Sequence, residues 1–350
     1  SDGNGGSDAE SFTITVTGDN DAPVATYTTA QSVNEGATIS GTLTSTDVDF
    51  GRTATYEVVG DMPDGLALDG STGAWTFDAS NSAYDSLAVG ETDTVTVNYS
   101  VADGLGASAT NSFTITVQGT NDAPVATYMT ARSATEDLAT ITGQLTRDDA
   151  DTNDGATYTL TDGPIAGLTL GTDGIWSFDP TNAAYQSLAA GASQLVTVQY
   201  LVSDGNGGSD AESFTITVTG DNDAPVATYM TARSATEDLA TITGQLTRDD
   251  ADTNDGATYT LTDGPIAGLT LGTDGIWSFD PTNAAYQSLA AGASQLVTVQ
   301  YLVSDGNGGS DAESFTITVT GDNDAPVATY TTAQSVNEGA TISGTLTSTD

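Results

Sequence analysis

Residues 195–219 read LVTVQYLVSDGNGGSDAESFTITVT, which is two apolar–polar alternations around a glycine-rich segment. An alternation with a period of two places every second side chain on the same face of a strand. The segment SDGNGG at 203–208 consists of residues that favour turns. We therefore predict a hairpin that buries one face, formed by Val196, Val198, Tyr200, Val202, Phe214, Ile216 and Val218.

The same alternation occurs in the preceding 70 residues or so, at Ile141/Leu145, Tyr158/Leu160, Leu168/Leu170 and Trp176/Phe178. With the stretch after Pro124, this gives about seven short strands in about 100 residues, a pattern typical of an antiparallel sandwich of the immunoglobulin type. A single helical signal interrupts them. Asp179 is a suitable N-cap or, alternatively, a cation ligand, and Pro180 is favoured at the first helical position, so we predict one or two helical turns over 179–188.

Landmark residues recur every 101 positions, as shown by Pro23, Pro124, Pro225 and Pro326 and by Trp75, Trp176 and Trp277. A period of this length corresponds to a whole domain. Residues 125–225 and 226–326 are identical, 24–124 is a diverged relative, and 1–47 recur as 304–350. We therefore predict three sandwich repeats at 24–124, 125–225 and 226–326, flanked by the C-terminal part of a repeat at 1–23 and the N-terminal part of another at 327–350.

The composition excludes several classes of function. The net charge is −43, and the only basic residues are five arginines. Such a chain repels nucleic acid and anionic lipid, so its natural small partner is a cation. Without cysteine, histidine or lysine there is no disulfide, thiolate metal site or ordinary base for a nucleophile, so we expect no enzyme. No apolar run approaches the roughly 18 residues of a membrane span, and we expect no membrane insertion.

Acidic clusters mark the repeat boundaries. The chain writes GDNDAP from Gly18, Gly220 and Gly321, and GTNDAP from Gly119. Calcium takes about six to eight oxygen ligands in irregular geometry, and these linkers supply such oxygens. The next repeat offers an acidic D-x-D loop and an Asp-Gly turn that can lie at the same end of a sandwich. We therefore predict calcium sites at the junctions. A solvated hinge remains the alternative for the linkers, and a plain turn for Asp204 and Asp305.

Four elements in order carry a family resemblance, namely an early glutamate (Glu35, Glu136, Glu237), a D-x-D pair, a V-x-D-G turn and the D-x-N-D-like linker. Together they resemble cadherin-like repeats, in particular the bacterial VCBS-type repeats of RTX adhesins. The resemblance implies a cadherin-like sandwich. It also implies that the early glutamate serves the junction after its own repeat, whereas the D-x-D and Asp-Gly aspartates serve the junction before it. The family's Asp-Arg-Glu segment is replaced here by Phe178-Asp179-Pro180.

Carried over residue by residue, the resemblance implies calcium ligands at Asp19, Asn20, Asp21, Glu35, Asp47, Asp49, Asp103, Asn121, Asp122, Glu136, Asp149, Asp151, Asp204, Asp221, Asn222, Asp223, Glu237, Asp250, Asp252, Asp305, Asp322, Asn323 and Asp324. The implied function is a calcium-rigidified stalk of a secreted bacterial surface adhesin, extracellular, with neighbouring repeats and distal adhesin domains as partners. The alternative is a lectin-like module that binds polysaccharide, with Trp176 and Tyr185 as stacking residues, although Trp176 shares an alternating face with Phe178 and is typical of a core.

The junctions are not expected to be equal. Arg52 stands in the first repeat where the second has Asp154, and the linker at Pro124 has Thr120 where the next has Asp221. We predict that the junctions before residue 24 and near Pro124 hold calcium less tightly, or hold fewer ions, than the junction near Pro225.

Overall fold

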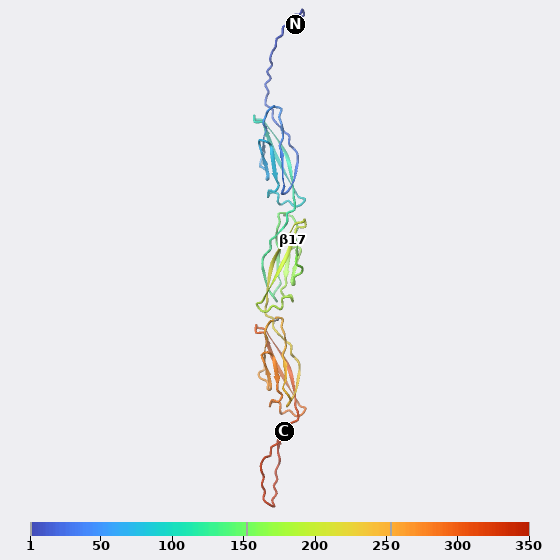
Figure 1. Ribbon diagram of the computed structural model, residues 1–350, viewed down its shortest axis with the longest axis vertical. Coiled ribbons are helices and arrows are strands. Elements are labelled where there is room, and N and C mark those ends of the chain that lie inside the picture. Colours follow the sequence, from blue (N-terminus) through green and yellow to red (C-terminus); the bar gives the residue numbers. More distant parts are fainter. Residues whose placement is uncertain (1, 152, 253, 350) are drawn as a thin grey trace.

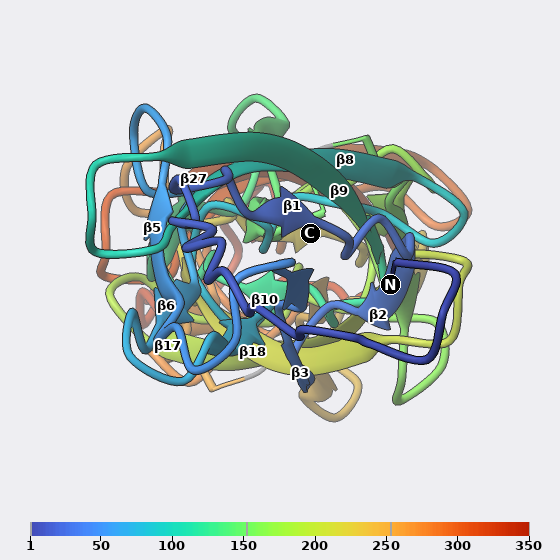
Figure 2. The same cartoon turned by 90° about the horizontal axis from the view of Figure 1, so that it is seen from above.

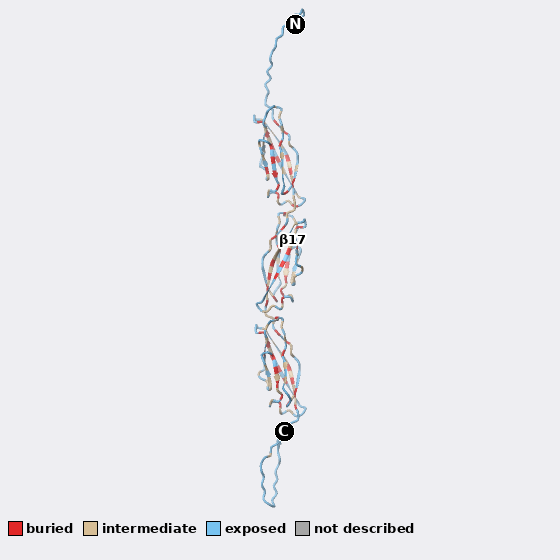
Figure 3. Cartoon of the chain, viewed as in Figure 1, coloured by how far each residue is buried: buried red, intermediate tan, exposed pale blue. Residues whose placement is uncertain are grey.

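A computed structural model describes residues 2–151, 153–252 and 254–349. Three β-sandwiches lie end to end in one extended line (Figure 1). Buried side chains occur in three separate groups, one in each sandwich (Figure 3). Seen along the long axis, the sandwiches overlap within one narrow outline, with β8 and β9 of the first on the opposite side from β17 and β18 of the second (Figure 2). The chain is therefore a rod of independent cores.

The strands repeat with the sequence. In the first repeat they are β1 (Val24–Ala25), β2 (Gln31–Asn34), β3 (Thr38–Thr42), β4 (Ser45–Thr46), β5 (Thr55–Val58), β6 (Leu66–Leu68), β7 (Ala74–Asp78), β8 (Thr92–Ala102) and β9 (Ser108–Gln118). In the second they are β10 (Val125–Ala126), β11 (Arg132–Thr135), β12 (Ile141–Gln144), β13 (Arg147–Asp148), β14 (Thr157–Leu160), β15 (Leu168–Leu170), β16 (Ile175–Phe178), β17 (Ser193–Ser203) and β18 (Ser209–Thr219).

The third repeat and the last residues follow the same order. Their strands are β19 (Val226–Ala227), β20 (Arg233–Thr236), β21 (Ile242–Gln245), β22 (Arg248–Asp249), β23 (Thr258–Leu261), β24 (Leu269–Leu271), β25 (Ile276–Phe279), β26 (Ser294–Ser304), β27 (Ser310–Thr320), β28 (Val327–Ala328) and β29 (Ser348–Thr349).

Each repeat is built from two sheets, as the sequence predicts. In the second repeat the order β11-β18-β17-β14 forms one sheet and β12-β16-β15 the other, and a short ribbon pairs β10 with β13. The predicted hairpin is confirmed, because β17 and β18 pair along their whole length and place Val198 opposite Phe214. One detail differs from an all-antiparallel sandwich. β11, the second strand of the repeat, runs parallel to β18, the last strand.

The cores contain the alternating residues of the prediction. Trp176, Phe178 and Tyr200 are at most 1% exposed, and an indole edge of Trp176 lies so close to Gly143 that a Cβ there would meet it at 2.5 Å. Tyr185 is also buried, and its hydroxyl donates to the carbonyl of Ala166 at 2.9 Å. Trp176 and Tyr185 therefore offer no surface for stacking on a sugar, and the lectin-like alternative loses its candidate residues.

The predicted helix at 179–188 is wrong. The segment forms successive turns with i→i+3 bonds, among them Tyr185 N–H to Asn182 O at 2.9 Å and Leu188 N–H to Tyr185 O at 3.1 Å. Asp179 does accept from the backbone N–H of Thr181 at 3.0 Å, as an N-cap does. However, the Asn182 side chain then takes the N–H of Ala184 at 3.1 Å and starts a second turn. Local side-chain bonds of this kind compete with helix propagation.

Candidate metal centres at the repeat junctions

The linkers that follow the three complete sandwiches leave through a glycine, Gly119, Gly220 or Gly321, that fits against the loop before the repeat's long hairpin. The N–H of Gly220 donates to Ala192 O at 2.8 Å, and a Cβ on Gly220 would meet Leu188 O and Ala189 O at 2.3 Å. At the other end of the linker, Pro225 is buried. The linker trio between them, Asp221-Asn222-Asp223, is therefore held at both ends.

The early glutamate of the preceding repeat reaches this linker. Glu136 follows β11, is fully buried, and accepts from the backbone N–H of Asp221 through Oε1 at 2.9 Å. Its Oε2 is buried without a partner. Burial raises the pKa of Glu136, the Asp221 N–H opposes this, and nearby Asp252 and Asp223 raise the pKa further. The site therefore disfavours a bare carboxylate and favours one that is neutralised.

The following repeat contributes its D-x-D loop. Asp252 is fully buried, and its Oδ2 accepts from the backbone N–H of Asp223 at 2.9 Å, whereas its Oδ1 has no partner. Asp223 Oδ2 is likewise buried and unpaired, and burial together with the charges of Asp137, Asp252 and Asp221 raises the pKa of Asp223. The linker and the next repeat thus each contribute a carboxylate with one buried, unpaired oxygen.

The Asp-Gly aspartate is both a turn residue and a linker contact. Asp305 Oδ1 accepts from the backbone N–H groups of Asn307, Gly308 and Gly309 at 2.6, 3.0 and 3.1 Å, so the turn alternative is correct for this atom. Asp305 Oδ2 accepts from the Asn222 side-chain amide at 3.0 Å. Burial acts to raise the pKa of Asp305, but these hydrogen bonds outweigh it, and the pKa lies below its usual value.

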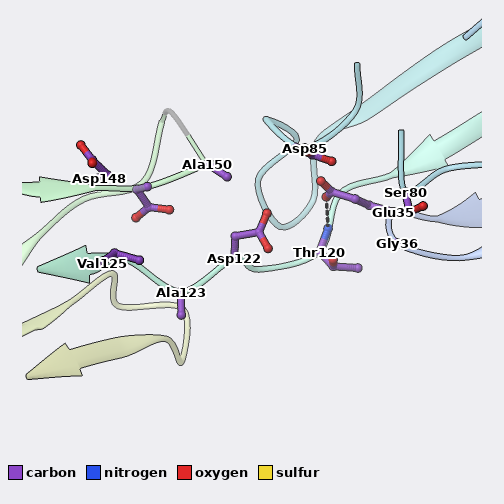
Figure 4. A pocket seen from close by; sticks show the side chains of 11 residues that line it. Glu35, Gly36, Ser80, Asp85, Thr120, Asp122, Ala123, Val125, Asp148 and Ala150 are labelled. Carbon is purple, nitrogen blue, oxygen red and sulfur yellow. Dashed lines mark hydrogen bonds between the residues drawn. The ribbon is translucent and has the colours of Figure 1, made fainter. Parts of the chain in front are cut away.

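The junction near Pro124 repeats this scaffold. Thr120 N–H donates to Glu35 Oε2 at 3.0 Å, Asn121 to Asp204 at 3.0 Å, and Asp122 N–H to Asp151 at 2.8 Å. Within the described residues, Glu35, Asp122 and Asp151 form the group of carboxylates whose oxygens lie within 4.8 Å of one another. Figure 4 shows Glu35 and Asp85 beside Asp122 in the cleft between the repeats. Burial raises the pKa values of Glu35 and Asp151.

The two outer junctions contain parts of the same arrangement. Before Pro23, Asn20 donates to Asp103 at 2.6 Å, Asp21 N–H to Asp49 at 2.9 Å, and Asp49 N–H to Asp47 at 2.8 Å. Near Pro326, Glu237 accepts from Asp322 N–H at 2.8 Å and keeps Oε2 buried and unpaired. There the Asn323 amide turns back to Asp324 O at 3.2 Å, and Asp324 is exposed.

Some predicted ligands point elsewhere. Asp149 and Asp250 pair with Arg147 and Arg248. The exposed aspartates at the start of three linkers each accept from the N–H of the next residue at 2.9–3.0 Å, namely Asp19, Asp221 and Asp322.

Sequence reasoning missed several charged residues at the junctions. Asp137 adopts φ 64°, where the first repeat has Gly36, and its charge raises the pKa values of Glu136 and Asp223. Asp85 lines the cleft at Pro124, and Glu91 accepts from the Asn153 amide across that junction at 3.0 Å. The signal for Asp137 was present, because aspartate tolerates the left-handed region and directly follows the early glutamate.

The donor set fits a hard divalent cation. At the junctions the unpaired buried oxygens come from carboxylates and side-chain amides, and they include Glu35 Oε1, Asn121 Oδ1, Asp151 Oδ1, Glu136 Oε2, Asn222 Oδ1, Asp223 Oδ2 and Asp252 Oδ1. One amide nitrogen in the loop before β17, Gln186 Nε2, is also buried and unpaired. Burying negatively charged or polar oxygen atoms without a hydrogen-bond donor costs free energy, and a bound cation removes that cost. Calcium is the ion that such oxygens suit best.

The fold is similar to solved cadherin structures. Mouse cadherin-23 EC22–24 is 16% identical with a TM-score of 0.54, covering 87% of this chain and 99% of that one, and human CDH23 EC21–23 is 18% identical with a TM-score of 0.56, covering 85% and 100%. Protocadherin gamma B2 domains 1–5 is 15% identical with a TM-score of 0.57, covering 88% of this chain and 61% of that one. At these identities the likeness concerns the fold alone.

No curated protein matches the sequence. The described residues include no helix long and apolar enough to cross a membrane. The bacterial Ig domain family matches residues 20–116, 121–218 and 222–319, each match spanning one sandwich. The chain therefore belongs to the bacterial Ig domain family, as a tandem array with cadherin-like structural neighbours.

Proposed function

We propose that this chain is a calcium-stiffened extender of a secreted bacterial surface adhesin, of the RTX kind with VCBS-type repeats. It would act outside the cell and hold distal binding domains, which lie outside this segment, away from the surface. Its repeats are 24–124, 125–225 and 226–326, with parts of two others at 1–23 and 327–350. The observation that carries the proposal is the cluster of Glu35, Asp122 and Asp151 near Pro124, in which one repeat, the linker and the next repeat bring carboxylate oxygens within 4.8 Å of one another.

At Pro225 the three contributors are separate in the chain. Glu136 belongs to the preceding repeat, Asp223 to the linker and Asp252 to the following repeat, and each has one oxygen without a hydrogen-bond donor. Calcium bound there would neutralise the carboxylates, and it would bind best when all three contributors are in place. The linker bonds to Glu136 and Asp252 hold the oxygens ready for it.

Without calcium, the same carboxylates repel one another across the linker. That repulsion loosens the angle between repeats, whereas a bound ion stabilises the aligned arrangement by mass action. Identical copies of one repeat also suit a spacer, because copying adds length without requiring a new recognition surface. The bacterial Ig domain family and the cadherin-like fold are consistent with an adhesion-type role of this kind.

Small-angle scattering of the whole segment tests the proposal. With calcium we expect an extended rod with a single maximum dimension and a raised melting temperature. With chelator we expect a shorter average dimension and a less rigid profile. The proposal is wrong if the scattering curve and the melting temperature are the same in both conditions.

A further inference from the structure

Arg147 and Arg248 lie beside the D-x-D loops and have no role in the sequence prediction. The Arg147 guanidinium pairs with the Asp149 carboxylate and also donates to the Asp154 carbonyl, closing the loop between these residues. The side chains of Arg147 and Asp149 are only 16% and 5% exposed. Arg248 makes the same two contacts in the third repeat, with Asp250 and Asp255.

This pairing uses up the first aspartate of the D-x-D pair. Asp149 Oδ2 binds the guanidinium, and Asp149 Oδ1 accepts from the N–H of Asp151 at 3.2 Å. The second aspartate is different, because Asp151 Oδ1 is buried without any partner. Only the second aspartate therefore keeps a free oxygen for a metal ion.

The first repeat shows the same place without arginine. Ser45 pairs with Ala25 as Arg147 pairs with Ala126, and its hydroxyl is bonded to the Tyr56 hydroxyl at 2.9 Å. Asp47 Oδ1 still accepts from the N–H of Asp49. An open cleft remains beside them, and its lining includes Ser45, Asp47, Asp49, Tyr56, Asp103 and Arg52.

We propose that the guanidinium groups of Arg147 and Arg248 are resident cations that take the place of one metal ion at the junctions near Pro124 and Pro225. Asp149 and Asp250 then position their loops and bind no calcium. This inference rests on the proposed function, because it concerns how the calcium sites are divided. It also changes the expected ranking of the junctions. Where the repeat after a junction has serine at this position, as the first repeat has Ser45, the first aspartate of the D-x-D pair stays available for a metal ion.

Calcium titration calorimetry on the whole chain tests the inference. The double variant Arg147→Ser/Arg248→Ser places at each site the residue that the first repeat has there. We expect it to bind one additional calcium ion at each altered junction. An unchanged number of ions overturns the inference even if affinity rises, because removing a positive charge strengthens binding at a distance anyway.

A second pair of variants decides the matter if the serine variant fails to fold, as checked by circular dichroism. We expect Asp149→Asn/Asp250→Asn to keep the number of ions and to change affinity by less than about threefold, whereas Asp151→Asn/Asp252→Asn weakens binding by about tenfold or more. Equal losses in the two pairs overturn the inference. A wild-type chain that binds no calcium overturns the proposed function as well, whereas a calcium-binding chain that fails these comparisons overturns only the inference.

Discussion

The junctions near Pro124 and Pro225 share one scaffold and differ in what surrounds it. In both, a linker N–H reaches the early glutamate, an asparagine amide reaches the Asp-Gly aspartate, and a second linker N–H reaches the D-x-D loop. Among the positions that differ, Thr120, Gly36, Asp85 and Glu91 at Pro124 correspond to Asp221, Asp137, Gln186 and Ala192 at Pro225.

The comparison indicates that the alignment of the repeats and the charge around a junction are set by different residues. The shared hydrogen bonds use backbone N–H groups and one asparagine, so they align the repeats whatever the local charge is. The varied positions set the electrostatics. Near Pro124, Glu91 and Asn153 bridge the repeats directly. Near Pro225, Asp137 and Asp221 add two carboxylates, whereas Pro124 has Asp85 and Glu91 instead, so the formal charge at these positions is the same. Because Ala192 cannot make the contact that Glu91 makes, we expect the Pro225 junction to depend more strongly on calcium.

The largest expected effect comes from removing one unpaired ligand. Asp252→Asn should weaken calcium binding at Pro225 by roughly 10- to 100-fold, because it removes a buried charged oxygen that has no other partner. Asp151→Asn should do the same at Pro124. Titration calorimetry measures both, with Asp61→Asn in an exposed loop as control. Wild-type affinity in either junction variant would count against these residues as ligands.

The next effect tests the shared scaffold. Gly220→Ala and Gly119→Ala each bring a Cβ to within about 2.3 Å of two backbone carbonyls, so each should destabilise the preceding repeat by about 1–3 kcal/mol. Thermal unfolding in chelator should show similar losses for the two variants, since the contact is the same at both junctions. A loss at only one junction would mean that the linkers leave their repeats differently.

The pH dependence of the chain's stability should reverse its sign when calcium is added. Burial raises the folded-state pKa values of Glu35 and Glu136 above 4.5 and those of Asp151 and Asp223 above 3.8. In chelator the folded chain therefore takes up protons before the unfolded chain does, and stability should rise as pH falls from 7 toward these pKa values. With calcium, protons compete with the metal, so the melting temperature should fall over the same range.

Below about pH 4 the trend in chelator should turn over. Asp103, Asp204 and Asp305 have pKa values below their usual value because of hydrogen bonds, which outweigh burial at the last two, and the stability that these carboxylates contribute is lost as they protonate. Melting curves from pH 7 to pH 3, with and without calcium, measure this. Parallel curves in the two conditions would show that the metal and the protons do not share these groups.

The smallest effect concerns the direct bridge. Glu91→Ala removes the contact to Asn153, an effect of about 0.5–1.5 kcal/mol, and should loosen the Pro124 junction in chelator. The reciprocal Ala192→Glu should tighten the Pro225 junction, where Asn254 is the counterpart of Asn153. Because the chain has no cysteine, spin labels at Thr94→Cys and Leu195→Cys report the first junction, and labels at Leu195→Cys and Leu296→Cys the second. If both distance distributions stay unchanged, the Glu91–Asn153 contact does not help to align the repeats.

Much of the fold follows from local pattern. An alternation with a two-residue period puts all the apolar side chains on one face of a strand, and that face packs in the core. The residues Val196, Val198, Tyr200 and Val202 follow this pattern and are buried. The helix at 179–188 was predicted wrongly because its start signals are also those of an Asx turn, and only the next turn, set by Asn182, decides between them.

The candidate site was less predictable. The linker trio and the early glutamate are clusters that sequence reveals. By contrast, the pairing of Asp149 with Arg147 depends on a loop folding back on its own strand. The contact of Glu91 with Asn153 depends on two repeats meeting, and no local pattern encodes it.

The central claim is that calcium turns mutual repulsion at the repeat borders into rigidity, and the two label pairs test it most directly. The account predicts narrow distance distributions at both junctions with calcium, broad ones in chelator, and the larger broadening at Pro225. Distributions of the same width with and without calcium at both junctions would contradict it.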